Sequence, residues 1–119
     1  MSELIFKSSL FLFFFAASTY AEFDVNNSLI DFYGLSEGKI NIVIKDNIDI
    51  QGEVTSAGSI ALQDNIASEN AFIIQKLLDA DFNIAGKANL SEWANFRSEN
   101  SVSGWSSIGG QTTHFLYNN

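Results

Sequence analysis

The sequence predicts an all-β fold, a short β-solenoid of stacked strand-turn-strand rungs that follows a cleaved signal peptide. Three observations predict it. Apolar and polar residues alternate over short runs, glycine, asparagine and serine interrupt these runs, and neither proline nor cysteine occurs among the 119 residues. Such alternation is typical of strands, and a chain without proline lacks a common device that blocks strand addition at sheet edges.

The first 21 residues have the features of a secretory signal peptide. Lys7 precedes an apolar run over residues 10–17, and Thr19 and Ala21 supply the small residues of a cleavage site before Glu22. A cation, an apolar run and small residues in this order are typical of secretory signals, and the run is too short for the ~20 residues of a membrane span. We therefore expect cleavage between Ala21 and Glu22, and a mature chain without a transmembrane segment.

The mature chain is small and acidic. Its formal net charge stays at −8 after cleavage, because one lysine and one glutamate leave together. This charge excludes the basic surface of a nucleic-acid-binding protein and disfavours binding to anionic lipid. The length suits one small domain, with an N-terminal segment over residues 22–45 that contains the first strand, and a repeat region over residues 46–119.

Alternation locates the strands in order. Ile40, Ile42 and Ile44 share one face of the first strand, and the runs 48–50, 60–62 and 82–84 repeat the pattern beside glycines. Residues 70–79 also carry apolar residues at helical spacing.

We favour a strand over residues 71–75, whose β-branched and aromatic run suits a sheet. Strict alternation turns Lys87 inward, where an unpaired ammonium group is costly, so we expect a register shift or bulge there.

Side-chain amides recur along the chain, most of them four residues after a small residue. Their spacing is about 11 to 14 residues, whereas the glycines offer a second register of about 17 to 18 residues. In a solenoid, equivalent side chains stack ~4.8 Å apart, and stacked amides can form a hydrogen-bonded ladder. The predicted ladder residues are Gln63, Gln75, Asn89, Asn100 and Gln111.

The repeats resemble those of the curlin family, in particular its fibre-nucleating members. Curlin repeats contain Asn-x-Ala-x-x-x-Gln, and residues 83–89 match this element with asparagine in the glutamine place. Residues 70–75 and 59–63 match its second half, and residues 21–28 resemble the segment that follows the signal in these proteins. The matches cover most of the mature chain, although each motif is short.

The resemblance implies an exported structural component of curli-type amyloid fibres at the surface of a Gram-negative bacterium, with a role in adhesion and biofilms. It would nucleate or join fibres by edge-strand templating, because open solenoid ends expose unpaired backbone groups. The implied partners are the major curlin subunit, further copies of the chain, and the outer-membrane curli secretion channel with its accessory proteins. Residues 22–28 would be recognised by that channel.

A second hypothesis is a small secreted β-domain that acts as an adhesin or a carbohydrate-binding module, with Trp93, Trp105, Phe115 and Tyr117 as stacking surfaces. An enzyme is not expected, since His114 is the sole histidine and no Gly-x-Ser-x-Gly elbow occurs. We expect no cofactor and no metal, because the aspartate pairs lack the spacing of calcium loops.

Overall fold

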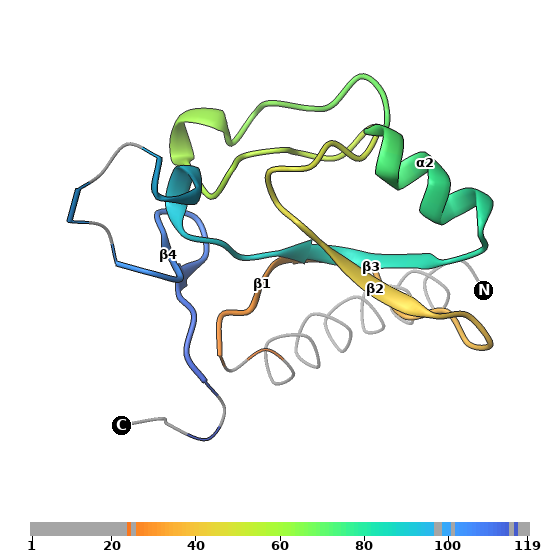
Figure 1. Cartoon of the computed structure of the whole chain (residues 1–119), viewed down its shortest axis with the longest axis horizontal. Helices are drawn as coiled ribbons and strands as arrows, with labels where there is room; N and C mark the ends of the chain where they lie inside the picture. Colours follow the sequence, from red (N-terminus) through yellow and green to blue (C-terminus); the bar gives the residue numbers. More distant parts are fainter. Residues whose placement is uncertain (1–23, 25, 97–98, 101, 115, 117–119) are drawn as a thin grey trace, which may run out of the picture.

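The computed structural model describes residues 24–116 except 25, 97–98, 101 and 115. These residues form a three-stranded mixed sheet in the order β1-β3-β2, a helix on one face of the sheet, and a small two-stranded hairpin (Figure 1). The elements in chain order are β1 (Leu29–Phe32), β2 (Asn41–Lys45), the 3-10 helix η1 (Ile60–Leu62), α2 (Phe72–Asp79), β3 (Asn83–Ala88), the 3-10 helix η2 (Glu92–Asn95), β4 (Trp105–Ser106) and β5 (Gly110–Gln111).

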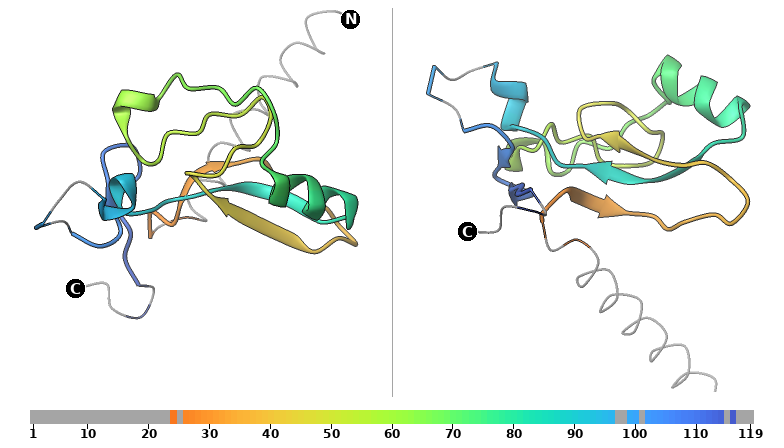
Figure 2. Two further views of the ribbon diagram at one scale, coloured as in Figure 1. Left: turned by 45° about the horizontal axis from the view of Figure 1, so that its top comes forward. Right: turned by 60° about the horizontal axis from the view of Figure 1, so that its bottom comes forward.

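The sheet is built around β3, its central strand. β1 pairs with β3 in antiparallel orientation, and β2 pairs with β3 in parallel. The connection from β2 to β3 runs through a long loop, η1 and α2, and lies mostly on one side of the sheet (Figure 2). A helix in such a connection is the usual way to join two parallel strands.

The hydrophobic core lies between α2 and the sheet. Ile44 of β2, Ile50 of the following loop and Ile74 of α2 are buried against one another. Ile74 is fully buried, and Leu77 packs against the same cluster one helical turn later. Apolar residues three positions apart share one face of a helix, so this packing suits the helical conformation of the segment.

The prediction of an all-β solenoid is wrong, and so is the strand predicted over residues 71–75. That segment belongs to α2, because tertiary packing of Ile74 and Leu77 outweighs the strand propensity of the adjacent isoleucines. The Gln75 side chain also donates to Asp79 Oδ1 at 2.9 Å, which is an (i, i+4) contact typical of a helix.

Two further predicted strands are absent from the described chain. Residues 60–62 form η1, whose backbone bonds are local, such as that from Leu62 N–H to the Ser59 carbonyl. Residues 48–50 form a bend and irregular backbone, where Ile48 N–H donates to the Lys45 carbonyl.

The strand predicted around residues 40–45 is confirmed as β2, although it begins at Asn41 and leaves Ile40 exposed. The prediction that Lys87 faces inward is also confirmed, since only 1% of this residue is exposed. The expected register irregularity lies nearby, because Ile42 pairs with Ile84 and Val43 with Gly86, which leaves one extra residue in β3.

Candidate functional site

The candidate site lies at the carboxyl ends of β2 and β3. Lys45, the last residue of β2, pairs with Ala88, the last residue of β3. The backbone N–H of Asp46 donates to the Ala88 carbonyl at 3.1 Å and continues the pairing by one residue. In open sheets with parallel strands, ligands bind beyond the carboxyl ends of the strands, so residues from distant parts of the chain meet where a site is expected.

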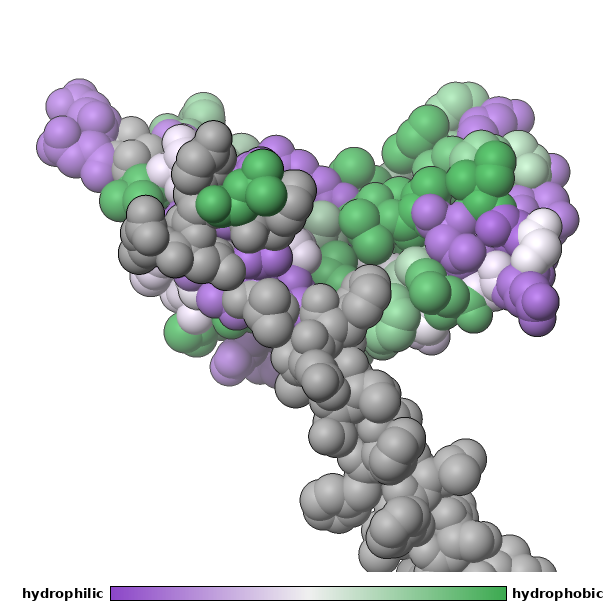
Figure 3. All heavy atoms as spheres, turned by 90° about the horizontal axis from the view of Figure 1, so that it is seen from below, coloured by the Kyte–Doolittle hydropathy of each residue, from purple (hydrophilic) through white to green (hydrophobic). Residues whose placement is uncertain are grey.

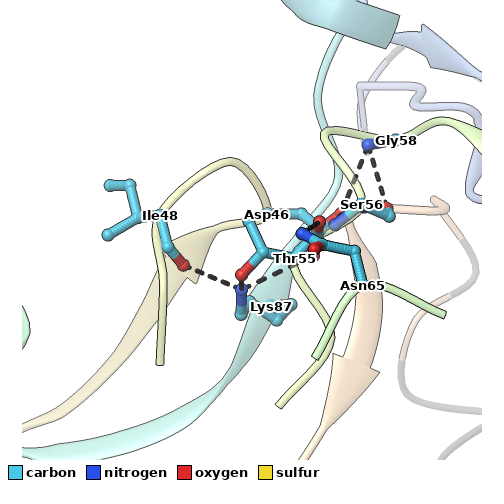
Figure 4. Close-up of polar contacts among 7 residues, drawn as sticks. All are labelled: Asp46, Ile48, Thr55, Ser56, Gly58, Asn65 and Lys87. Carbon is cyan, nitrogen blue, oxygen red and sulfur yellow. Dashed lines mark hydrogen bonds and ion pairs between the residues drawn. The ribbon is translucent and has the colours of Figure 1, made fainter. Parts of the chain in front are cut away.

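A buried ion pair forms the base of the site (Figure 4). Lys87 Nζ lies 3.6 Å from Asp46 Oδ1, and both side chains are 1% exposed. The same ammonium group donates to the Ile48 carbonyl at 2.8 Å and to Thr55 Oγ1 at 3.3 Å. Burial lowers the pKa of Lys87, and the Asp46 carboxylate partly offsets this effect. The ammonium group that was expected to be costly therefore has three partners.

The second oxygen of Asp46 holds the loop that crosses above the strand ends. Asp46 Oδ2 accepts hydrogen bonds from the backbone N–H groups of Ser56 and Gly58, both at 3.2 Å, and from the Ser56 hydroxyl group. Gly58 has a φ of +73°, and a Cβ atom there would lie 2.7 Å from Ser106 Cβ. The loop thus requires glycine at this position and packs closely against the hairpin of β4 and β5.

Lys45 lies on the other face of β2. Ile42 and Ile44 point into the core under α2, so alternation places Val43 and Lys45 on the opposite face. Lys45 is exposed, and its ammonium group has no hydrogen-bond or ion-pair partner among the described residues. Figure 3 shows hydrophobic side chains gathered toward the centre and right of the molecule as seen from below. The site therefore combines the exposed amino group of Lys45 with the buried contacts of Lys87 and Asp46.

Asn89 ties the end of β3 to the hairpin of β4 and β5. Its Nδ2 donates to the Asn27 carbonyl at 3.0 Å, the Gly110 carbonyl at 3.1 Å and Thr112 Oγ1 at 3.0 Å. Its Oδ1 accepts from the Ser106 hydroxyl group at 2.7 Å. One side chain thus joins three separate parts of the chain beside the candidate site.

Glu92 forms a further contact between η2 and the hairpin. Its Oε2 accepts a hydrogen bond from the Ser107 backbone N–H at 2.8 Å. Partial burial would raise the pKa of Glu92, but hydrogen bonds from Ser107 and Ser59 outweigh it and lower this pKa. The carboxylate is therefore held in its ionised form by its partners.

The five predicted ladder amides lie on five different parts of the chain. Asn89 follows β3 and lies beside the candidate site, where it bonds to Asn27, Gly110, Thr112 and Ser106. The other four residues are Gln63 after η1, Gln75 in α2, Asn100 between η2 and β4, and Gln111 in β5. The predicted cleavage site at Ala21 and Glu22 lies outside the described residues. A hydrogen-bonded ladder of these five amides stays a prediction.

Asp46 and Lys45 are site residues that the sequence patterns did not predict. A signal for Asp46 is present, because alternation over Ile42 and Ile44 places residue 46 on the same inward face as the lysine of the neighbouring strand. Lys45 carries no such local signal, since exposed lysines are common.

Metal-binding clusters and membrane-spanning helices are both absent from the part of the chain that the structure describes. These residues contain no group of three or more His, Cys, Asp or Glu residues that could hold a metal ion. Within the same ranges, no helix combines the length and the apolar composition needed to cross a membrane.

A family model described as Amidase matches residues 37–114 of the chain. An amidase homologue from Arthroderma benhamiae is 48% identical over 73 residues, which are 60% of this chain and 12% of that protein. A component of the glutamyl-tRNA(Gln) amidotransferase of Sulfurimonas denitrificans is 40% identical over 68 residues, which are 57% of this chain and 15% of that protein.

Solved structures give the same result. The peptide amidase of Stenotrophomonas maltophilia aligns with a TM-score of 0.65 and 37% identity, over 73% of this chain and 22% of that chain. An amidase family protein of Bacillus anthracis aligns with a TM-score of 0.64 and 31% identity, over 73% of this chain and 21% of that chain. The chain thus spans about an eighth to a fifth of the length of these relatives.

These matches overturn the curlin resemblance and what it implied. The chain is not a curli fibre subunit or an adhesin, and the curlin partners and secretion channel have no support. The prediction that it is not an enzyme is also contradicted, because its homologues are amidases and amidotransferase components. The curlin motifs misled because the segments 59–63 and 70–75, which matched as repeats, contain the 3-10 helix η1 and the first residues of α2. Since the family model matches more than half of the chain, the chain belongs to the amidase family.

Proposed function

We propose that this chain takes part in the hydrolysis of a carboxamide C–N bond, with Lys45 as the group that transfers protons. The observation that carries the proposal is the position of Lys45, exposed at the carboxyl end of β2 within the residues that match the amidase family. The relatives with higher structural similarity are amidases, whereas the amidotransferase structure of Thermotoga maritima aligns with a TM-score of 0.51. Hydrolysis is therefore favoured over amide transfer.

The chemistry of amide hydrolysis needs a group of this kind. A hydroxyl nucleophile attacks the amide carbonyl carbon and gives up its proton to a base as the new C–O bond forms. The C–N bond then breaks, and the same group returns the proton to the leaving nitrogen. Water subsequently releases the acid and restores the hydroxyl group. The neutral amine form of the Lys45 side chain can accept this proton, and the ammonium ion that results returns it to the leaving nitrogen.

The nucleophile is assigned to a segment outside the described residues. None of the described hydroxyl groups forms a hydrogen bond with Lys45, and the Ser56 hydroxyl group is buried and donates to Asp46 on the other face of β2. The matched residues span about a fifth of an amidase structure. The proposal therefore gives this chain the proton-transfer residue and its frame.

A chimera tests the proposal. Residues 37–114 of this chain would replace the aligned segment of the Stenotrophomonas maltophilia peptide amidase, and ammonia release from a peptide amide would be measured. We expect Lys45→Met to lower kcat by about 100-fold or more, as removal of a general base does. Lys39→Met is the matched control, because Lys39 forms an exposed ion pair with Asp81 and should alter kcat by less than about twofold.

Two outcomes of the chimera experiment decide the matter. A Lys45→Met chimera that keeps the kcat of the unsubstituted chimera, with the same melting temperature, would refute the role of Lys45. If Lys39→Met and Lys45→Met lower kcat equally, the loss reflects the general charge of the segment and the proposal is also wrong.

We also propose that residues 1–21 direct the chain out of the cytoplasm and that the mature protein begins at Glu22. The proposal rests on the order of Lys7, the apolar run and Ala21. N-terminal sequencing of the protein from a periplasmic or culture fraction tests it. An N-terminus at Met1 in that fraction would contradict the proposed cleavage.

A further inference from the structure

We propose that Lys87 is a positioning residue for Lys45, and that its buried ammonium group fixes the turn after β2. The inference rests on the proposed function, since it names what holds the proton-transfer residue in place. Lys87 lies on the core face of the sheet beside Ile44, whereas Lys45 lies on the opposite face of β2. Lys87 therefore acts on Lys45 through the backbone, because the two side chains lie on opposite faces of the sheet.

The ammonium group of Lys87 contacts three positions of the segment after β2. It donates to the Ile48 carbonyl at 2.8 Å and to Thr55 Oγ1 at 3.3 Å, and it forms an ion pair with Asp46 Oδ1 at 3.6 Å. Ile48 in turn donates its backbone N–H to the Lys45 carbonyl at 3.0 Å. Ile48 thus links the two lysines: its carbonyl accepts from Lys87, and its N–H donates to Lys45.

Asp46 fixes the backbone directly after Lys45. Its backbone N–H donates to the Ala88 carbonyl at 3.1 Å, and its carbonyl accepts from Ala57 N–H at 3.2 Å. Its carboxylate bonds to Ser56 and Gly58 while Lys87 balances its charge. Because Asp46 and Ile48 are both held in this way, the backbone that follows Lys45 is fixed, and with it the direction of the Lys45 side chain.

The position of Lys45 matters because a proton-transfer group must lie within about 2.6–3.2 Å of the atom it serves. A lysine side chain has a flexible four-carbon stem, so its reach is defined only if its backbone is fixed. A misplacement of about 1 Å can lower a reaction rate about 100-fold. A residue that fixes the turn therefore affects catalysis without contact with the substrate.

The test uses the full chain and needs no catalysis. Backbone ¹⁵N relaxation and amide hydrogen exchange would be measured in the wild type, Lys87→Met, and the double variant Asp46→Asn/Lys87→Met. Lys39→Met, which removes an exposed lysine, is the control. In Lys87→Met we expect the order parameter at Lys45 to fall from about 0.85 to below about 0.6. The amides of Ile48 and Gly58 should exchange at least about tenfold faster, while those of β1 stay within about twofold.

The double variant separates positioning from stability. It removes both buried charges, so the unfolding midpoint should return toward that of the wild type. The Ile48 carbonyl still lacks its donor, so the order parameter at Lys45 should remain low. A double variant that restores both quantities would show that Lys87 is merely structural and would overturn the proposal. If Lys87→Met alone does not fold, the double variant still decides between these results.

The chimera supplies the link to catalysis. There, Lys87→Met should lower kcat about tenfold or more with KM within about twofold, because the substrate does not contact Lys87. A proportional rise of KM at unchanged kcat would overturn the positioning role. If instead Lys45→Met leaves kcat unchanged, the proposed function fails, and the relaxation measurements still show whether Lys87 holds Lys45.

Discussion

Replacement of Lys87 by methionine is the substitution with the largest expected effect on stability. Methionine keeps the apolar stem but removes the ammonium group, so the Asp46 carboxylate is left 1% exposed without its counter-ion. Breaking a buried ion pair from one side costs about 3–5 kcal/mol. Small domains have free energies of unfolding of about 5–15 kcal/mol, so the variant should lose a large part of its stability.

Urea and thermal unfolding, each followed by circular dichroism, measure this loss as a free energy of unfolding and as a change in Tm. For a domain of this size, about 3 kcal/mol corresponds to a decrease in Tm of about 12 °C or more. The control is Lys39→Met, which removes an exposed pair with Asp81 and should cost less than about 1 kcal/mol. If the free energy of unfolding of Lys87→Met lies within about 1 kcal/mol of the wild-type value, the ion pair does not stabilise the fold, and the reasoning from its burial is refuted.

Three further substitutions test other contacts. Gly86→Ala should lower the free energy of unfolding in urea by about 1–3 kcal/mol, because the new Cβ would lie 2.2 Å from the Asp31 carbonyl oxygen. A stability equal to that of the wild type would show that β1 can move away. Asn89→Ala should cost about 1–3 kcal/mol and speed amide exchange in β5, since the Gly110 carbonyl loses its donor, and unchanged exchange there would count against this link. The pKa of Glu92 is lowered from its ordinary value of 4.5, so the stability that its carboxylate contributes is present above about pH 4.5 and is lost as the pH falls through the lower folded-state value. Glu92→Gln should abolish this pH dependence in acid titrations followed by fluorescence. An acid midpoint equal to that of the wild type would contradict this role of Glu92.

Local patterns predicted the part of the fold that alternation controls. β2 was predicted because its isoleucines alternate with exposed residues, and the inward direction of Lys87 followed from the same rule. Alternation cannot show which strands pair, so the parallel pairing of β2 with β3 was missed. The partner of Lys87 was missed for the same reason, because Asp46 reaches it only when these strands lie side by side.

The helix and the function depended on information that short motifs do not contain. Residues 71–75 have strand propensity, and only the burial of Ile74 against the sheet decides for α2. The resemblance to curlins rested on amides at regular intervals. Amide side chains also cap turns and bond to several separate segments, as Asn89 does with Asn27 and Thr112. Sequence similarity over residues 37–114 was needed to assign the family.

The parallel pairing of β2 with β3 has a consequence for how the chain folds. Lys45 and Ala88 become neighbours only after the loop between them has closed, which costs entropy before any strand contact forms. Pairing between distant segments is slow, whereas α2 can form locally and early. Because the chain contains no proline, no prolyl isomerisation delays refolding. We therefore expect the pairing of β2 with β3, which the ion pair of Lys87 and Asp46 stabilises, to set the refolding rate.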